Sequence, residues 1–128
     1  MSRAVVPIYN ALIRTHHITS RKKVASLKKA ADKYACYVLL RSGGSPGIMY
    51  CEGSEDSVRD WVTIVQQLRY KDYRLAARPN ELGSKAGEVA SRPDSRGFQE
   101  VTTVKEFGVK MQEFGIWTWW RIAMGYGP

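Results

Sequence analysis

The sequence has few of the residues that build metal centres and disulfides. It contains only two cysteines, Cys36 and Cys51, and only two histidines, His16 and His17. The cysteines lack the paired spacing of metal ligands, so we interpret them as reduced interior thiols of an intracellular protein. Two adjacent histidines with two distant cysteines also make a poor ligand set for zinc. The sequence therefore predicts no metal site and no cofactor.

Recognisable catalytic motifs are absent as well. The sequence has no GxxxxGK[ST] loop, no GxGxxG and no Ser-His-Asp set. His17-Ile18-Thr19 matches the His-x-Thr element of two-histidine phosphoesterases, but that chemistry needs two such elements and this chain can supply one. We therefore expect a protein that is not an enzyme.

Long apolar runs are missing too. No apolar stretch reaches the roughly 18 residues that a membrane-spanning helix needs, and no signal sequence opens the chain. The composition, 44% hydrophobic and 25% charged, is that of a globular protein with one domain. These features predict no membrane partner and an intracellular protein of the nucleus or cytoplasm.

Negative charge is scarce in the first third of the chain. The net charge is +8, and residues 1–33 carry eight lysines and arginines against Asp32 alone. Residues 34–78 contribute +1, and residues 79–128 are neutral overall. A basic region concentrated in this way attracts phosphate backbones or acidic protein surfaces.

The middle of the chain has the clearest structural pattern. An apolar run, Ile48–Cys51, predicts a buried or half-buried strand, and Ser54 is a good N-cap for a following helix. Apolar residues then recur at helical spacing, at Val58, Trp61, Val62, Val65 and Leu68. A further strand is expected at about residues 72–78. This half of the chain is thus predicted to be strand, helix, strand.

The first half repeats that order. Residues 11–18 alternate apolar and polar side chains imperfectly and predict the first strand. This strand would place Leu12, Arg14 and His16 on one face and Ala11, Ile13, Thr15 and His17 on the other. Residues 21–34 predict a helix capped by Thr19 or Ser20. Residues 36–41 predict the second strand, and the Ser-Gly-Gly-Ser-Pro segment 42–46 predicts a hairpin into the third. The result is an α+β fold with ferredoxin-like βαββαβ order, an antiparallel sheet carrying two helices on one face.

A C-terminal helical extension should follow this domain. We expect a ferredoxin-like domain over 1–78 (core 10–78), a flexible loop over 79–97, and a strand and helix extension over 98–128 that packs on the domain. Thr103 with Glu106 fits a capping box for the first extension helix. A last helix over 116–124 holds Trp117, Trp119 and Trp120, which either dock this helix on the domain or form a binding surface.

The most conspicuous polar cluster lies between the first strand and the first helix. His16 and His17 are followed by hydroxyl residues and by three consecutive cations, over residues 19–23. Because a helix N-terminus offers free N–H groups to an anion, this junction suits phosphate or an acidic side chain. The alternative is that Ser20 only caps the helix and that the cations form a solvated face.

A second candidate surface is the sheet face that the two helices leave open. It would combine basic and aromatic side chains suited to phosphates and splayed bases: Arg14, His16, Arg74, Arg78 and either Tyr50 or Tyr73. This grouping depends on the direction in which each strand faces. It also depends on whether the extension covers the face, which the sequence leaves open.

Several of these motifs together resemble a known family. They are His16-His17-Ile18 with Ser20 and Lys22-Lys23, then Gly44-x-Pro46-Gly47-Ile48 and Glu52-Gly53, then Trp61 and Leu68-Arg69-Tyr70-Lys71. In this order they resemble the C-terminal domain of the spliceosomal pre-mRNA-processing factor three, which also occurs C-terminal to RWD domains. The tail, with Trp119-Trp120-Arg121 and Met124-Gly125-Tyr126, looks like the segment that follows this domain in fungal relatives and suggests a stand-alone fungal member.

The resemblance implies a ferredoxin-like domain that binds small nuclear RNA, duplex and adjoining single strand, without being an enzyme. It implies RNA contacts at His16, His17, Lys22 and Lys23, and charge adds Arg14, Lys29, Lys33, Lys71 and Arg74. We therefore expect a non-enzymatic RNA-binding protein linked to RNA processing. The alternative is a protein-interaction module whose basic helix docks an acidic protein partner.

Overall fold

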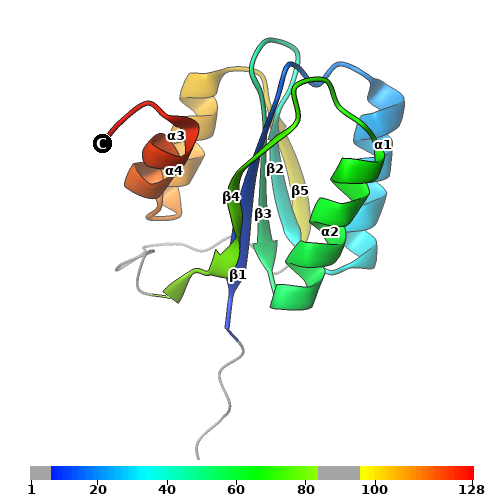
Figure 1. Ribbon diagram of the computed structural model, residues 1–128, viewed down its shortest axis with the longest axis horizontal. Coiled ribbons are helices and arrows are strands. Elements are labelled where there is room, and N and C mark those ends of the chain that lie inside the picture. The colour runs from blue at the N-terminus through cyan, green and yellow to red at the C-terminus, as the bar shows by residue number, and fades with distance from the viewer. Residues whose placement is uncertain (1–6, 84–95) are drawn as a thin grey trace, which may run out of the picture.

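The computed structural model describes residues 7–83 and 96–128. These residues form three layers, with a central sheet and a pair of helices on each face (Figure 1). The elements are, in chain order, β1 (Tyr9–Thr15), α1 (Arg21–Lys33), β2 (Tyr37–Arg41), β3 (Gly47–Gly53), α2 (Glu55–Gln67), β4 (Arg74–Glu81), β5 (Gly97–Val101), α3 (Val104–Glu113) and α4 (Trp117–Met124). The predicted α+β class is confirmed.

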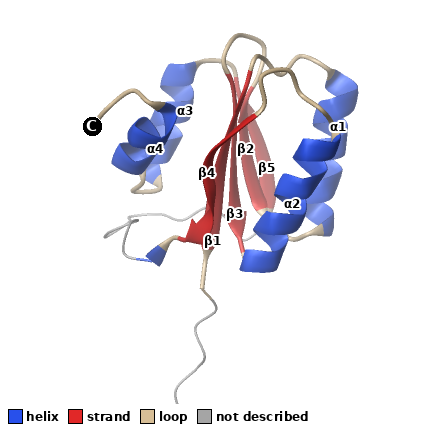
Figure 2. Ribbon diagram, viewed as in Figure 1, coloured by secondary structure: helices blue, strands red, loops and turns tan. Residues whose placement is uncertain are grey.

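The sheet has five strands in the order β4-β1-β3-β2-β5. β1 lies antiparallel to both β3 and β4, and β2 lies antiparallel to β3. β5 joins the outer edge of β2 and runs parallel to it. Figure 2 shows α1 and α2 on one face of this sheet and α3 and α4 on the other.

Hydroxyl side chains fix the starts of three helices. Ser20 Oγ accepts a hydrogen bond from Lys23 N–H, and Ser54 Oγ accepts one from Ser57 N–H, each at 3.2 Å. Thr103 Oγ1 accepts from Glu106 N–H at 3.0 Å, as the predicted capping motif requires. Each bond satisfies an N–H group that would have no partner within its helix.

The C-terminal ends of β1 and β4 each differ from the prediction by three residues. β1 ends at Thr15 rather than Ile18, because residues 16–20 turn away to begin α1. β4 continues to Glu81, so residues 79–81, which we assigned to the flexible loop, belong to a strand. An edge strand tolerates Pro79, since its missing N–H is not required by a neighbour. Most of the remaining loop, residues 84–95, lies outside the described residues.

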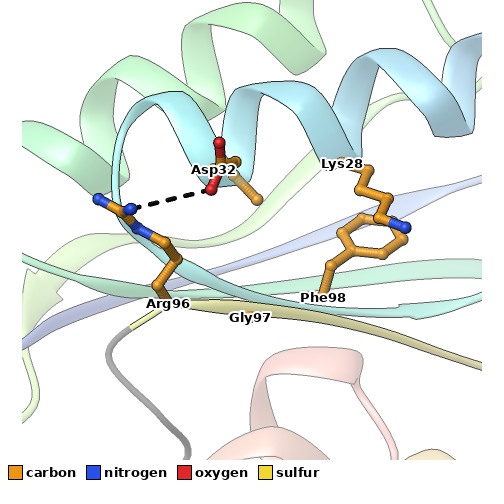
Figure 3. Close-up of a pocket in the computed structure, with 6 residues that line it drawn as sticks. Lys28, Asp32, Arg96, Gly97 and Phe98 are labelled. Atoms are coloured by element: carbon orange, nitrogen blue, oxygen red, sulfur yellow. Dashed lines mark ion pairs between the residues drawn. The ribbon is translucent and has the colours of Figure 1, made fainter.

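The edge strand β5 packs beside α1 (Figure 3). Arg96, which precedes β5, points toward Asp32 on α1, with 3.8 Å between Arg96 Nη1 and Asp32 Oδ1. Further along, Lys28 and Phe98 line the same pocket between α1 and β5. β5 therefore covers one flank of α1. The α1 cations on the other flank remain available to a partner.

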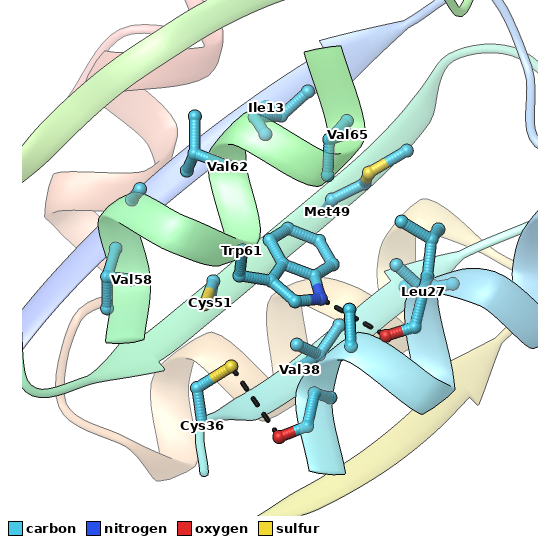
Figure 4. Close-up of a cluster of buried hydrophobic side chains, with 14 of the residues drawn as sticks. Ile13, Leu27, Cys36, Val38, Met49, Cys51, Val58, Trp61, Val62 and Val65 are labelled. Carbon is cyan, nitrogen blue, oxygen red and sulfur yellow. Dashed lines mark hydrogen bonds between the residues drawn. The ribbon is translucent and has the colours of Figure 1, made fainter. Parts of the chain in front are cut away.

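The first core lies between the sheet and the α1 and α2 helices (Figure 4). Trp61 is fully buried at its centre, and its Nε1–H donates to the carbonyl of Leu27 at 3.1 Å, which joins α2 to α1. Both cysteines lie in this core as buried free thiols, as predicted. Burial raises the pKa of the Cys51 thiol, which keeps it protonated and unreactive.

The second core lies on the opposite sheet face. Here α3 and α4 cover the sheet, and Phe107, Met111 and Trp120 pack against residues such as Leu12 and Ile48. Tyr50 is fully buried in this core, with its ring edge-on to Trp119 at 5.9 Å between centroids. The expectation of an open face that includes Tyr50 is therefore wrong, because the C-terminal extension covers that face.

Candidate nucleic-acid interface

Three chain connections meet at one end of the sheet, the upper end in Figure 1. Backbone hydrogen bonds tie the loop of residues 16–20 to its neighbours. His16 N–H donates to the Lys71 carbonyl at 2.9 Å, and Gly43 N–H donates to the Ile18 carbonyl at 2.9 Å. The loop that carries both histidines is thus held between the β2–β3 hairpin and the α2–β4 connection.

Gly47, the first residue of β3, allows this loop to lie close to the sheet. Its N–H donates to the His16 carbonyl at 3.3 Å. A Cβ at this position would collide with Thr15 Oγ1 and would lie 2.8 Å from Ile18 Cγ1 and 3.1 Å from the His17 carbonyl carbon. Because one of these atoms is backbone, the loop can keep its position only over glycine.

The two histidines are neighbours at this end of the sheet. Their ring centroids are 4.7 Å apart, with 51° between the ring planes. His16 Nδ1 lies 3.6 Å from Asp72 Oδ2, so a protonated His16 forms an ion pair with that carboxylate. His17 is exposed. The pair therefore presents two imidazoles to solvent, one of which is oriented by Asp72.

Lys23 and Lys71 extend the basic surface from the histidines. The Lys23 ammonium lies 4.7 Å from the centroid of the Tyr70 ring, and Tyr70 itself is buried. This cation–π contact fixes Lys23 above the α2–β4 connection, where Lys71 follows Tyr70 directly. The structure thus brings together four of the predicted contacts, His16, His17, Lys23 and Lys71.

The cations of α1 divide between two flanks of the helix rather than forming one basic face. Arg21 and Lys28 lie on the β5 flank, and both Arg21 terminal nitrogens bond the Glu100 carboxylate. Lys29 and Lys33 lie on the α2 flank, and Lys22 belongs to the same row by its spacing of seven and eleven residues. Among the described residues, the cations in a row on the α2 flank have no carboxylate partner.

A groove runs between α1 and α2 on this flank. It encloses about 310 Å³, and its walls are apolar side chains with cations and amides at the rim: Ser26, Lys29, Ala30, Lys33, Tyr34, Ile64, Gln67 and Leu68. The Lys33 ammonium lies 5.3 Å from the centroid of the Tyr34 ring. The groove therefore combines apolar surface with positive charge.

Arg14 and Arg74 form a separate pair. They are directly opposite each other on β1 and β4, and Arg14 shares a sheet face with Leu12, on the side of α3 and α4. Tyr73 instead packs against the α1 and α2 core. The predicted grouping of arginines, His16 and a tyrosine on one sheet face is therefore wrong. The surface that carries the two arginines adjoins the histidines at the end of the sheet.

Few carboxylates neutralise this basic surface. Within residues 7–83 and 96–128, Asp72 is the one acidic side chain paired with a predicted contact residue, and its partner is His16. Lys22, Lys29, Lys33 and Lys71 have no carboxylate partner in the same part of the chain. The same described residues contain no group of three or more His, Cys, Asp or Glu that could hold a metal ion.

Sequence reasoning missed the role of Tyr70. It named Lys23 and Lys71 by charge and family resemblance, whereas the aromatic platform under Lys23 belongs to a segment 47 residues further along the chain. The groove walls from α2 were also missed, because Leu68 was assigned to the buried stripe of the helix and Ile64 was not singled out. No local pattern identifies either feature.

Comparison with known proteins adds information on the fold. No protein-family model and no curated protein matches the chain. The structure is similar to a solved structure described as BlrP1 BLUF, with a TM-score of 0.55 and 11% sequence identity over 89% of this chain and 80% of that one. At this identity the likeness supports the mixed α+β fold and nothing about activity. No helix among the described residues is long and apolar enough to cross a membrane.

Proposed function

We propose that this chain is a non-enzymatic RNA-binding protein that contacts the RNA backbone through its basic β1–α1 region. The observation that carries the proposal is the row of Lys22, Lys29 and Lys33, which leads to the histidine pair at the end of the sheet. These lysines have no carboxylate partner among the described residues. Lysines used in this way supply point charges to phosphates, and affinity then depends strongly on salt.

The dimensions of the row suit a nucleic-acid strand. Lys33 lies eleven positions after Lys22 on the helix, which corresponds to a track of about 16 Å along α1. His16, His17 and Lys71 continue this track around the end of the sheet. Several phosphates can therefore be contacted in succession, and we expect four to six of these cations to take part.

The covered sheet face narrows the proposed mode of binding. Since α3 and α4 occupy the face on which bases could otherwise stack, Tyr50 cannot act as a stacking platform. Contacts should then go mainly to phosphates and riboses. Such contacts position a protein on the RNA without reading the base sequence. We accordingly propose weak sequence preference, with Arg14 and Arg74 as outlying contacts.

The family resemblance is part of this proposal. We assign β1 to β4 with α1 and α2 to the ferredoxin-like arrangement, and the order β4-β1-β3-β2 with both helices on one face supports that assignment. We further propose a role with small nuclear RNA or in RNA processing. Its support is the set of motifs around His16, Gly47 and Lys71, which lie together at the same end of the sheet.

The decisive experiment is a binding titration with a labelled RNA duplex that has a single-stranded 3′ overhang, at two salt concentrations. A DNA duplex of matching sequence and overhang is the control. The proposal predicts micromolar or tighter binding that prefers RNA and weakens steeply with salt. Absence of binding to either nucleic acid at low salt would overturn it and would favour an acidic protein partner on the same cations.

A further inference from the structure

Exposed apolar side chains gather on the C-terminal helices. Among the described residues, five large apolar side chains are exposed, and four of them lie on α3 or α4 or just after α4. These are Val109 (48% exposed), Trp117 (40%), Ile122 (59%) and Tyr126 (37%). Apolar side chains clustered on one surface usually mark an interaction site, whereas scattered ones do not.

A groove lies between α3 and α4 within this surface. It encloses about 270 Å³ and is lined by Val104, Lys105, Gly108, Val109, Gln112, Trp117, Trp120, Arg121 and Tyr126. A Cβ on Gly108 would lie 3.1 Å from Trp120 Cζ3, so the two helices approach closely because this residue is glycine. Trp120 is buried, and its Nε1–H has no hydrogen-bond partner among the described residues.

The charged residues that line the groove are both cations. Arg121 is held between Trp117 and Tyr126, with its guanidinium carbon 5.2 Å and 5.5 Å from their ring centroids. Its Nε–H donates to the Gly127 carbonyl at 3.1 Å and its Nη2 to the Tyr126 carbonyl at 3.0 Å. Nη1 has no partner in the described part of the chain, and neither Arg121 nor Lys105 pairs with a carboxylate there.

We propose that this groove, the α3/α4 groove, binds an acidic amphipathic peptide segment of a partner protein. Apolar side chains of the peptide would cover Val109 and Trp117, and its carboxylates would pair with Lys105 and Arg121. Helical segments commonly dock in this way, through apolar residues at helical spacing laid in a groove between helices. A stacked and preordered arginine suits carboxylate recognition particularly well.

Charge favours such a peptide over a second copy of this chain. A symmetric contact through the α3/α4 groove would bring Lys105 and Arg121 of both copies together, and these are the charged residues that line the groove. An acidic partner would instead neutralise them. The groove lies across the sheet from α1 (Figure 1), so the inference does not depend on RNA binding at α1.

Peptide display provides the test. A random library of short peptides is selected on the wild-type protein, with counter-selection on Val109→Glu, whose new carboxylate would occupy an exposed site and leave the cores intact. The proposal predicts enriched peptides rich in Asp and Glu, with apolar residues three or four positions apart. Their binding should weaken at least tenfold with Val109→Glu and with Lys105→Glu.

Matched controls separate the groove from its surroundings. Lys110→Glu reverses a charge on the same helix outside the groove and should leave peptide binding unchanged, as should Lys22→Glu on the opposite side of the sheet. In ¹⁵N-labelled protein, the peptide should shift the Trp117 and Trp120 indole N–H signals but not that of the core residue Trp61. Lack of enrichment over the counter-target, enrichment of basic peptides, or self-association abolished by Trp117→Ala would each overturn the proposal.

Discussion

Arg21 and Glu100 are joined by two parallel hydrogen bonds although 79 residues separate them. Nη1 lies 2.9 Å from Oε2, and Nη2 lies 2.8 Å from Oε1. Ser42 Oγ also donates to Glu100 Oε2 at 2.7 Å. One carboxylate therefore links the start of α1, the hairpin after β2, and β5. The same pairing removes Arg21 from the cations available to a phosphate.

Replacement of Glu100 by glutamine should make stability less sensitive to acid. The hydrogen bond from Arg21 is the main cause that lowers the pKa of Glu100. A carboxyl whose pKa is lowered by folding stabilises the protein at pH values above its ordinary pKa of about 4.3. This contribution is lost as the pH falls through the folded-state pKa. Thermal unfolding should show a lower Tm for Glu100→Gln at pH 7 and a difference that narrows below about pH 4. A constant difference at all pH values would contradict this explanation.

Alanine at Gly47 should destabilise the protein and weaken RNA binding together. Its Cβ would push against the backbone of residue 17 and displace the histidine loop. We expect a loss of about 1–3 kcal/mol, as for other overpacked sites, measured by chemical denaturation. Gly44→Ala is the control, because the three atoms nearest its Cβ all belong to the Arg41 guanidinium, the end of a flexible side chain. Equal stability of the two variants would show that the loop does not need this close approach.

Removal of the Tyr70 hydroxyl should stabilise the fold. This hydroxyl is buried without a partner among the described residues, and burial raises the pKa of Tyr70 to about 12. Tyr70→Phe should gain about 1 kcal/mol at neutral pH, since an unsatisfied polar group is removed. It should also reduce the loss of stability above about pH 10, where the unfolded tyrosine ionises and the folded one stays neutral. Denaturation curves of the wild type and Tyr70→Phe at pH 7 and pH 10.5 would measure both effects on the free energy of unfolding. A variant less stable than the wild type at pH 7 would mean that the hydroxyl has a partner.

Charge reversal along α1 should weaken RNA binding without unfolding the protein. The double variant Lys22→Glu/Lys29→Glu changes two exposed residues of the α2 flank and spares Lys23, whose contact with Tyr70 is structural. We expect a large loss of affinity, a Tm close to wild type, and a salt slope smaller by about two. The matched control is Lys105→Glu/Lys110→Glu on α3, which lowers the net charge by the same amount. If this control weakens binding as much as the α1 variant, the effect comes from net charge and not from a site.

The helices and their starts were predictable because their signals are local. Ser20, Ser54 and Thr103 each precede an apolar pattern of helical spacing, and each one caps the predicted helix. The alternation in β1 also placed Leu12 and Ile13 on opposite faces, as the structure has them. In all these cases the information lies within a few neighbouring residues.

The covered sheet face could not be predicted with the same certainty. The continuous apolar run Ile48–Cys51 in β3 is typical of a strand buried on both faces, and this was the available signal. The division of the α1 cations has no local signal, because it depends on β5 packing beside Lys28 and Arg21. Contacts between distant segments decided which predicted site residues stay accessible.

The parallel pairing of β5 with β2 also affects how the protein is made. Tyr37 pairs with Gly97, so this edge of the sheet cannot form until the chain has grown 60 residues beyond Tyr37. Until α3 and α4 follow, Leu12, Leu39 and Ile48 have no cover on their side of the sheet. A nascent chain that pauses on the ribosome at this stage would expose this apolar face and would bind chaperones. The exposure would end once α3 and α4 have emerged and packed on the sheet.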